Sequence, residues 1–206
     1  MEQKLIVSPS PHLRSGATTQ KIMLDVIIAL TPAAIASCIL FGVQALILIL
    51  TCVGSCVLAE YLSRRVMKRD NTIFDLSAVV TGILLAFNLP VTISPLIAIF
   101  GSVVAIVVVK QMFGGIGQNF VNPALTARIV LMASFPAKMS NWVVPFWYRI
   151  GNPDAITTAS PLGLLKQGAA DQLPNHLDML LGARAGCLGE TCAIALLLGG
   201  IYLIVR

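Results

Sequence analysis

The sequence predicts an all-α integral membrane protein with about six transmembrane helices. Hydrophobic residues make up 57% of the 206 residues and charged residues only 11%, and the mean hydropathy is +0.88. These values exclude an ordinary soluble domain. Two runs of 34 residues, 26–59 and 76–109, contain no charged residue. A transmembrane helix needs roughly 20 apolar residues, so each run is long enough for a hairpin of two helices.

Turn residues divide each uncharged run into two helices. The first run is interrupted at Phe41-Gly42-Val43-Gln44 and the second between Asn88 and Pro95, because Gly, Asn and Pro favour turns. Residues 121–136 predict a fifth helix, since Pro123 suits a first helical turn, and an apolar C-terminal run predicts a sixth. The predicted helices are 22–42, 44–63, 75–89, 93–112, 121–136 and 187–205.

Lysine and arginine residues orient these helices. The basic residues that precede the first helix, or lie between the second and third, are Lys4, Arg14, Lys21, Arg64, Arg65, Lys68 and Arg69. The positive-inside rule makes this side cytoplasmic. We therefore expect a five-helix membrane domain at 1–136, an extracytoplasmic loop at 137–186 and a sixth helix at 187–206. The N-terminus lacks the pattern of a cleaved signal peptide, so we expect it to remain in the cytoplasm.

The net charge of +5 is explained by this orientation, and we expect no nucleic-acid partner because no basic stripe is interleaved with aromatic residues. We also expect no metal site, since the five cysteines form no CxxC pair and have no histidine at zinc-ligand spacing. Buried cysteines usually pack as small hydrophobes. A disulfide between Cys187 and Cys192 is the alternative if that end faces an oxidising compartment.

The most informative motif is the segment 152–162, NPDAITTASPL, in the predicted outer loop. From its residue types alone it is a turn region rich in Ser, Thr and Pro. Its order of acid, hydroxyl, Ala, hydroxyl and Pro-Leu resembles the flavin attachment site of the RnfD and NqrB family of membrane subunits. In that family FMN is joined through its phosphate, as a phosphoester, to a Thr or Ser hydroxyl.

The resemblance assigns a role to each position of the motif. Asp154 takes the acidic position, Thr157 the first hydroxyl and Thr158 the position where glycine is common. Ala159 matches the family, and Ser160 takes the attachment position, where threonine is usual. Serine is chemically adequate because the reaction needs only a nucleophilic hydroxyl. Ser160 is therefore the first choice for covalent FMN, with Thr157 and Thr158 as alternatives.

The resemblance extends along the whole chain. Segments 10–33, 74–90, 114–128 and 186–204 resemble RnfD segments in the same order. RnfD is a better match than NqrB because the chain opens almost directly with Ser-Pro-His. RnfD proteins continue into a second set of helices, so the resemblance implies a C-terminally short chain.

The resemblance also implies a function. It indicates a subunit of an Rnf-type ion-translocating ferredoxin:NAD oxidoreductase in the inner membrane of a bacterium or archaeon, not active alone, with electron relay coupled to Na⁺ or H⁺ translocation. Its partners would be membrane lipid and the subunits RnfA, RnfB, RnfC, RnfE and RnfG, through which ferredoxin and NAD are reached. Since side chains do not pass single electrons at useful potentials, a flavin must do so.

Two other classes stay open. A channel or secondary transporter without a redox cofactor would use helices broken at 88–90 and 122–123, although it leaves the 152–162 motif unexplained. A scaffold with an impaired core is a third possibility.

A second, noncovalently bound riboflavin is implied by the resemblance. The segment Gly114-Gly115-Ile116-Gly117 is either a tight turn or non-helical backbone that lines a cofactor cavity. In the second case Asn119 and Asn122 supply polar contacts. Arg128, a charge within the fifth predicted helix, needs a partner, which is either a flavin or an acid from a neighbouring helix.

The remaining polar and aromatic candidates have more ordinary interpretations. The acids near predicted helix ends, for which capping is favoured over an intramembrane function, are Asp25, Glu60, Asp75 and Glu190. Trp142, Trp147 and Tyr148 are first an interfacial belt and second flavin neighbours. The SGAT sequence at 15–18 lacks the acid and the Pro-Leu of the attachment motif, so Thr18 is interpreted as part of the start of the first helix.

Overall fold

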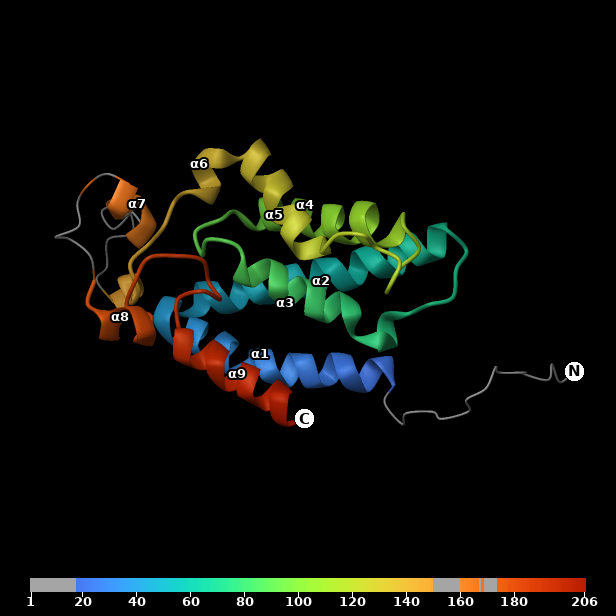
Figure 1. Ribbon diagram of the computed structural model, residues 1–206. Helices are drawn as coiled ribbons and strands as arrows, with labels where there is room; N and C mark the ends of the chain where they lie inside the picture. Colours follow the sequence, from blue (N-terminus) through green and yellow to red (C-terminus); the bar gives the residue numbers. More distant parts are fainter. Residues whose placement is uncertain (1–17, 150–159, 167, 169–173) are drawn as a thin grey trace, which may run out of the picture.

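The computed structural model describes residues 18–149, 160–166, 168 and 174–206 (Figure 1). In the described part a π-helical segment, Val104–Gln111, continues α4, and 3₁₀ turns occur at Ile73–Asp75 and Trp147–Arg149. The α-helices are α1 (Thr19–Phe41), α2 (Val43–Val66), α3 (Ser77–Phe87), α4 (Pro95–Val103), α5 (Pro123–Ser134), α6 (Pro136–Met139), α7 (Pro161–Lys166), α8 (His176–Leu181) and α9 (Ala193–Val205).

The first two helices form the predicted hairpin. Thr18 begins α1 as its N-cap, with its hydroxyl oxygen accepting a hydrogen bond from the Lys21 N–H at 3.3 Å. Gly42 separates the two helices at a φ of +71°, a conformation that glycine adopts without steric cost. Within the described residues, α1 and α2, with 23 and 24 residues, are the helices long and apolar enough to cross a membrane.

The other predicted helices are present but shorter. The α3, α5 and α9 helices have 11, 12 and 13 residues. The predicted start of the sixth helix at 187 is wrong, because α9 begins at Ala193. The preceding segment is held instead by its backbone, with the N–H groups of Leu188 and Gly189 donating to the carbonyls of Leu89 and Phe87 at 3.2 and 3.0 Å. The number of membrane crossings stays a prediction.

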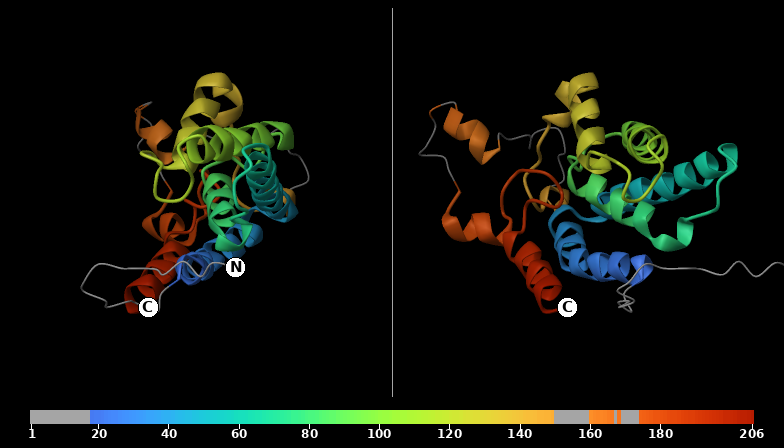
Figure 2. Two further views of the ribbon diagram at one scale, coloured as in Figure 1. Left: turned by 90° about the vertical axis from the view of Figure 1, so that its right-hand side faces the viewer. Right: turned by 45° about the vertical axis from the view of Figure 1, so that its right-hand side comes forward.

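Close helix packing depends on small residues. The α2 helix packs against α3 and α4, while α9 lies along α1 (Figures 1 and 2). A Cβ atom on Gly82 of α3 would lie 2.7 Å from the Cα of Val53, and one on Gly199 of α9 would collide with the Ala29 carbonyl. Small residues let helix backbones approach in this way in membrane proteins, where van der Waals packing drives helix association.

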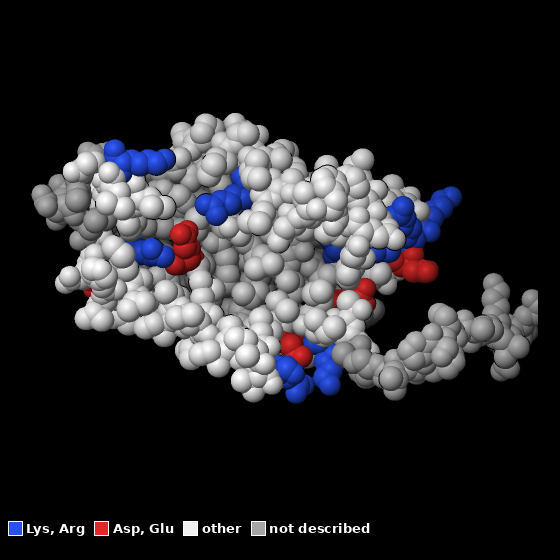
Figure 3. All heavy atoms as spheres, in the orientation of Figure 1, with Lys and Arg blue, Asp and Glu red and all other residues white. Residues whose placement is uncertain are grey.

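Large apolar side chains cover the outside of the helices. Ile39, Leu50 and Leu197 are 56%, 61% and 63% exposed. Figure 3 shows charged side chains mainly toward the two ends of the face it draws, with largely uncharged surface between them. An apolar exterior of this extent is consistent with a membrane protein.

The loops lie mainly at two ends of the helical bundle. We name them the inner and outer ends, after the predicted cytoplasmic and extracytoplasmic sides. The inner end contains the start of α1 and the loops 67–76 and 112–122, while the chain ends at Arg206 beside Asp25 of α1 (Figure 1). The outer end contains the turn at Gly42 and helices α6 to α8. The predicted cytoplasmic segments in the described part thus share one end, as the alternation of helices requires. The orientation of the chain in the membrane stays a prediction.

Candidate functional site

The outer end contains a cavity of about 190 Å³ between four segments of the chain. Its lining includes Arg128 from α5, Trp142 from the 140–146 segment, Ser160 beside α7 and Arg184 from the segment after α8. The cavity therefore brings together two arginines and the hydroxyl that the sequence motif favours for flavin attachment.

Ser160 is positioned by the helix that follows it. Its carbonyl accepts from the Leu164 N–H at 3.0 Å and its Oγ from the Gly163 N–H at 3.3 Å. These contacts hold a half-buried side chain at the cavity wall. Within the described residues the Ser160 hydroxyl proton has no acceptor, so the oxygen can form an ester without breaking a donated hydrogen bond.

Arg128 is held by a neutral partner. Its Nη1 donates to Asn88 Oδ1 at 2.9 Å, and Asn88 Nδ2 donates in turn to the Leu84 carbonyl at 2.7 Å. Arg184 Nη2 donates to the backbone carbonyl of Glu190 at 2.8 Å. In the part of the chain that the structure describes, neither arginine forms an ion pair with a carboxylate. Among the described residues the partner of Arg128 is thus the Asn88 amide and not an acid from a neighbouring helix.

Cys187 forms an apolar part of the same wall. Burial raises the pKa of its thiol to about 11, although the charge of Arg128 acts in the opposite direction. The thiol is therefore neutral at physiological pH and is no nucleophile there. Cys187 and Cys192 are both free, which agrees with the packing interpretation of these cysteines and not with a disulfide.

The other predicted members of the attachment motif cannot be placed. Asp154, Thr157, Thr158 and Ala159 lie outside the described residues. Of the three aromatic candidates, Trp142 lines the outer cavity, while Trp147 is only 8% exposed and Tyr148 donates its hydroxyl to the Ile39 carbonyl at 2.9 Å.

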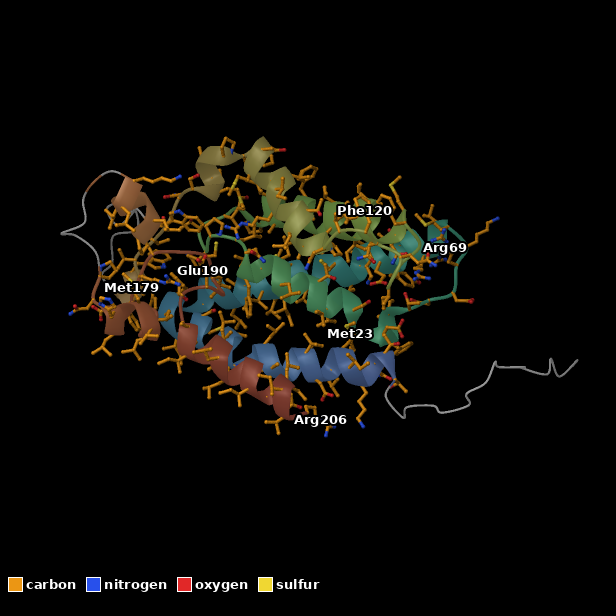
Figure 4. The ribbon with its side chains drawn as sticks, in the orientation of Figure 1. Met23, Arg69, Phe120, Met179, Glu190 and Arg206 are labelled. Carbon is orange, nitrogen blue, oxygen red and sulfur yellow. The ribbon has the colours of Figure 1, made fainter. Side chains whose placement is uncertain are left out.

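A second cavity, of about 150 Å³, lies toward the inner end. Figure 4 labels one lining residue of each cavity, Met23 and Glu190, and shows them toward opposite ends of the structure. Apolar atoms of α1, α3 and α5 form much of the wall, and the polar lining residues are Ser77, Thr81, Lys110 and Asn119.

The glycine-rich segment forms a turn, and part of it also lines the inner cavity. Gly114, Gly115 and Gly117 have φ values of +116°, +108° and +81°, so the segment is a turn that requires glycine. Gly117 and Asn119 also line the inner cavity. Asn122 has another role, because its Oδ1 accepts from the N–H groups of Ala124 and Leu125 at 3.0 and 3.4 Å and caps α5.

The sequence analysis missed the most buried charged side chains among the described residues. Glu60 is 0% exposed and Lys110 is 2% exposed, and Lys110 Nζ lies 2.9 Å from Glu60 Oε2. The interpretation of Glu60 as a capping residue at a helix end is wrong, because α2 continues to Val66 and keeps Glu60 inside the packed helices. A signal was available in the sequence: Glu60 and Lys110 carry opposite charges and lie near the same end of neighbouring predicted helices.

The other acids near helix ends lie closer to the surface. Asp25 Oδ1 lies 3.4 Å from Arg206 Nε and accepts from the Tyr202 hydroxyl at 3.2 Å. Asp75 ends a 3₁₀ turn and is partly buried. Glu190 is exposed at the outer cavity.

Comparison with known proteins shows the family of this chain. The profile of the NQR2, RnfD, RnfE family matches residues 6–206. The D subunit of the Na⁺-translocating ferredoxin:NAD⁺ oxidoreductase complex of Acetobacterium woodii is 48% identical over 100% of this chain and 64% of its own length. The D subunit of the proton-translocating complex of Clostridium ljungdahlii is 42% identical, over 97% of this chain and 62% of its own length.

A third relative, the D subunit of the ion-translocating oxidoreductase complex of Rhodobacter capsulatus, is 35% identical over 95% of this chain and 62% of its own length. The chain thus spans slightly less than two thirds of the length of these curated relatives. The match of nearly all its residues to one profile, together with these identities, shows that the chain belongs to the NQR2, RnfD, RnfE family.

Proposed function

We propose that this chain acts as a D-type membrane subunit of an ion-translocating ferredoxin:NAD⁺ oxidoreductase complex and carries FMN as a phosphoester on Ser160. The observation that carries the proposal is the outer cavity, where the Ser160 hydroxyl shares one wall with Arg128 and Arg184. The names of the relatives supply the class of complex.

The chemistry of the outer cavity fits a flavin phosphate. A phosphate ester linked to both serine and the ribityl chain carries a negative charge and has acceptor oxygens. Arginine suits such a group because its planar guanidinium presents several N–H donors and stays charged. The cavity is smaller than the roughly 300–1,000 Å³ of typical ligand pockets, so it accommodates the phosphate and adjoining carbons while the flavin ring extends beyond it.

Three lining residues of the cavity, together with the hydrogen-bond partner of Arg128, then have defined tasks. Ser160 Oγ forms the ester bond and loses its proton, Arg128 and Arg184 bind the phosphate oxygens, and Asn88 orients Arg128. When bound, the flavin supplies electron transfer that the side chains cannot. The relatives move Na⁺ in one case and protons in another, so the transported ion is left open in this proposal, and the other subunits of the complex are its expected partners.

The inner cavity is the proposed site of a noncovalent riboflavin. Asn119 offers an amide and Ser77 and Thr81 offer hydroxyls, next to apolar walls, a combination typical of sites for ring ligands. Because this cavity is also small, it holds one edge of the ring system. Asn122 contributes to this site through the shape of the 112–122 loop and the start of α5 rather than as a contact.

Covalent attachment can be tested on a denaturing gel. The chain, produced in cells that possess the flavin-attaching enzyme, is expected to give a fluorescent band that Ser160→Ala abolishes. Thr18→Ala, in the look-alike SGAT sequence, is the matched control and is expected to keep the fluorescence. Mass spectrometry of the tryptic peptide 150–166 then identifies the modified hydroxyl.

Two results would change the proposal. Fluorescence that survives in Ser160→Ala but disappears in Thr157→Ala or Thr158→Ala would move the attachment site. A native chain without covalent flavin in those cells would refute the attachment itself.

A further inference from the structure

The buried pair Glu60 and Lys110 belongs to a longer hydrogen-bonded chain of side chains. Lys110 lies in the π-helical segment 104–111 and Glu60 in α2. Lys110 Nζ donates to Glu60 Oε1 and Oε2 at 3.1 and 2.9 Å, and to Ser77 Oγ at 2.6 Å. An ammonium group has three N–H donors, so these contacts use all of them.

The hydroxyl proton of Ser77 is not donated to any described residue. The Ser77 Oγ itself accepts from Lys110. Both Ser77 and Lys110 line the inner cavity. A hydroxyl whose oxygen accepts from a cation is a stronger donor than a free one, because successive hydrogen bonds polarise one another. The Ser77 hydroxyl is therefore available to a ligand in that cavity.

The opposite end of the chain of side chains reaches the 67–76 loop. Glu60 Oε1 accepts from Thr72 Oγ1 at 3.0 Å and from Gln111 Nε2 at 3.0 Å. Thr72 is partly exposed in this loop at the inner end of the structure. The sequence of contacts Thr72, Glu60, Lys110, Ser77 thus connects the surface of the loop to the inner cavity.

Burying Glu60 and Lys110 costs desolvation free energy, and apolar side chains could fill the same space without that cost. Replacing a buried ion pair by apolar residues of similar volume is often neutral or stabilising. Glu60 is already saturated by donors from Lys110, Thr72 and Gln111. It therefore acts as the anchor of Lys110 and not as an open cation site.

We propose that Thr72, Glu60, Lys110 and Ser77 form a proton relay that delivers one proton to a ring ligand in the inner cavity when that ring gains one electron. The proposal rests on the proposed function, which supplies a flavin as the ring and a reduced redox centre of the complex as electron donor. Ser77 gives its hydroxyl proton to the ring and regains one from Lys110. Glu60 returns a proton to Lys110, and Thr72 passes Glu60 a proton that it regains from a hydronium ion or buffer acid at the surface of the 67–76 loop. The net change is one electron from the donor and one proton from that acid, both added to the ring, and the four relay residues return to their starting protonation states.

The surroundings of the relay contain few other titratable groups. Among the described residues, Cys56 and Arg64 also act electrostatically on Lys110, and Arg69 Nη1 donates to the Gln111 carbonyl at 3.2 Å.

The relay can be tested with riboflavin as the probe. The Ser160→Ala chain, which cannot carry flavin at that position, is purified in detergent and loaded with riboflavin. Reduction in a stopped-flow instrument separates protonated from unprotonated reduced flavin by absorbance. Ser77→Ala and Thr72→Val are each expected to slow protonation of the reduced ring about 10²-fold, the lower range for a positioned proton donor, and to decrease its solvent isotope effect.

Control variants separate the relay from a structural role. Ser77→Thr keeps the hydroxyl and is expected to keep the native rate. Ser102→Ala removes a buried hydroxyl that donates to the Ala98 carbonyl outside the relay and is expected to change nothing. Ser77→Ala keeps the contacts between Lys110 and Glu60 but removes one acceptor of Lys110 and one polar contact of the riboflavin site, so the rates of all variants are compared at saturating riboflavin and below the melting temperature of each.

Native protonation rates in both Ser77→Ala and Thr72→Val would refute the relay, and so would a Ser160→Ala chain that does not bind riboflavin. A native chain that lacks covalent flavin refutes the attachment proposal but leaves this measurement intact, because the relay is measured without any flavin on Ser160.

Discussion

The outer and inner cavities present their cations differently. At the outer cavity Arg128 is held by the neutral amide of Asn88 and forms no ion pair with a described carboxylate, while the exposed Glu190 also lines this cavity. At the inner cavity Lys110 is paired with Glu60 at 2.9 Å and offers the cavity only the adjoining Ser77 hydroxyl. The first arrangement suits an anionic group and the second an uncharged ring. In the proposed assignment of ligands, the partner of each cation, and not its presence alone, distinguishes the two cavities.

The largest expected effect comes from breaking the inner pair. Lys110→Met leaves Glu60 buried without its counter-ion and is expected to destabilise the fold by about 3–5 kcal/mol. The double variant Glu60→Leu with Lys110→Met removes both charges and is expected to recover most of this loss. Thermal unfolding in detergent measures both. Equal melting temperatures for the single and double variants would show that the pair is not closed in the way described.

The reactivity of the Cys187 thiol tests whether its part of the outer-cavity wall is buried. With its pKa raised from 9.0 to about 11, the thiolate fraction at pH 8 is expected to be about 100-fold lower than in the unfolded chain. Alkylation by iodoacetamide, followed by mass spectrometry, is therefore expected to be at least that much slower in the native protein than after denaturation. The native rate is expected to rise with pH up to about pH 11. Rapid alkylation of the native protein at pH 8 would show that Cys187 is not buried in the wall of the outer cavity.

Arg128 distinguishes the cavities by ligand charge. In the Ser160→Ala background, Arg128→Gln is expected to weaken the binding of free FMN at least tenfold, because a hydrogen bond to a charged group contributes about 1.5–3 kcal/mol. Binding of riboflavin, which lacks the phosphate, is expected to remain unchanged. Fluorescence titration measures both ligands, and Lys138→Gln, a charge change at an exposed residue of α6, is the control. An equal loss for FMN and riboflavin would remove the assignment of Arg128 to the phosphate.

The smallest effect is expected at the ion pair outside both cavities. The side chains of Arg206 and Asp25 are 52% and 18% exposed, and pairs of this kind contribute roughly 0–1 kcal/mol. Asp25→Asn is therefore expected to lower the melting temperature only slightly, with a decrease that is smaller at high salt. A loss as large as that of Lys110→Met would show that solvent exposure does not separate the two pairs.

Much of the fold was predictable because hydropathy and turn chemistry act locally. The uncharged runs located α1 to α4, and Gly42, Pro95 and Pro123 lie where the sequence placed helix ends. The start of α9 was missed, although residues 187–192 contain Gly189, Glu190 and Thr191 and are less apolar than α9. They are held in another conformation by carbonyls of Phe87 and Leu89, about a hundred residues earlier in the chain.

The two candidate sites were also only partly predictable from the sequence. The sequence singled out Ser160, Asn119 and Arg128 through their motifs and their unusual places in apolar surroundings, and the family resemblance is confirmed by the profile match. The pairing of Arg128 with Asn88, the contribution of Arg184 and the network around Lys110 were missed. These contacts join residues 40, 50 and 33 positions apart, or different segments of one cavity.

The sequence by itself determined that this chain consists largely of apolar helices, that two runs of 34 residues contain no charge, and that it resembles RnfD. Composition and local pattern contain this information because each helix satisfies its own backbone hydrogen bonds. Only the tertiary structure decided which charge is neutralised and which remains available. Whether a buried lysine or arginine meets a carboxylate or an amide depends on how helices distant in sequence pack, and that packing sets the electrostatics of both cavities.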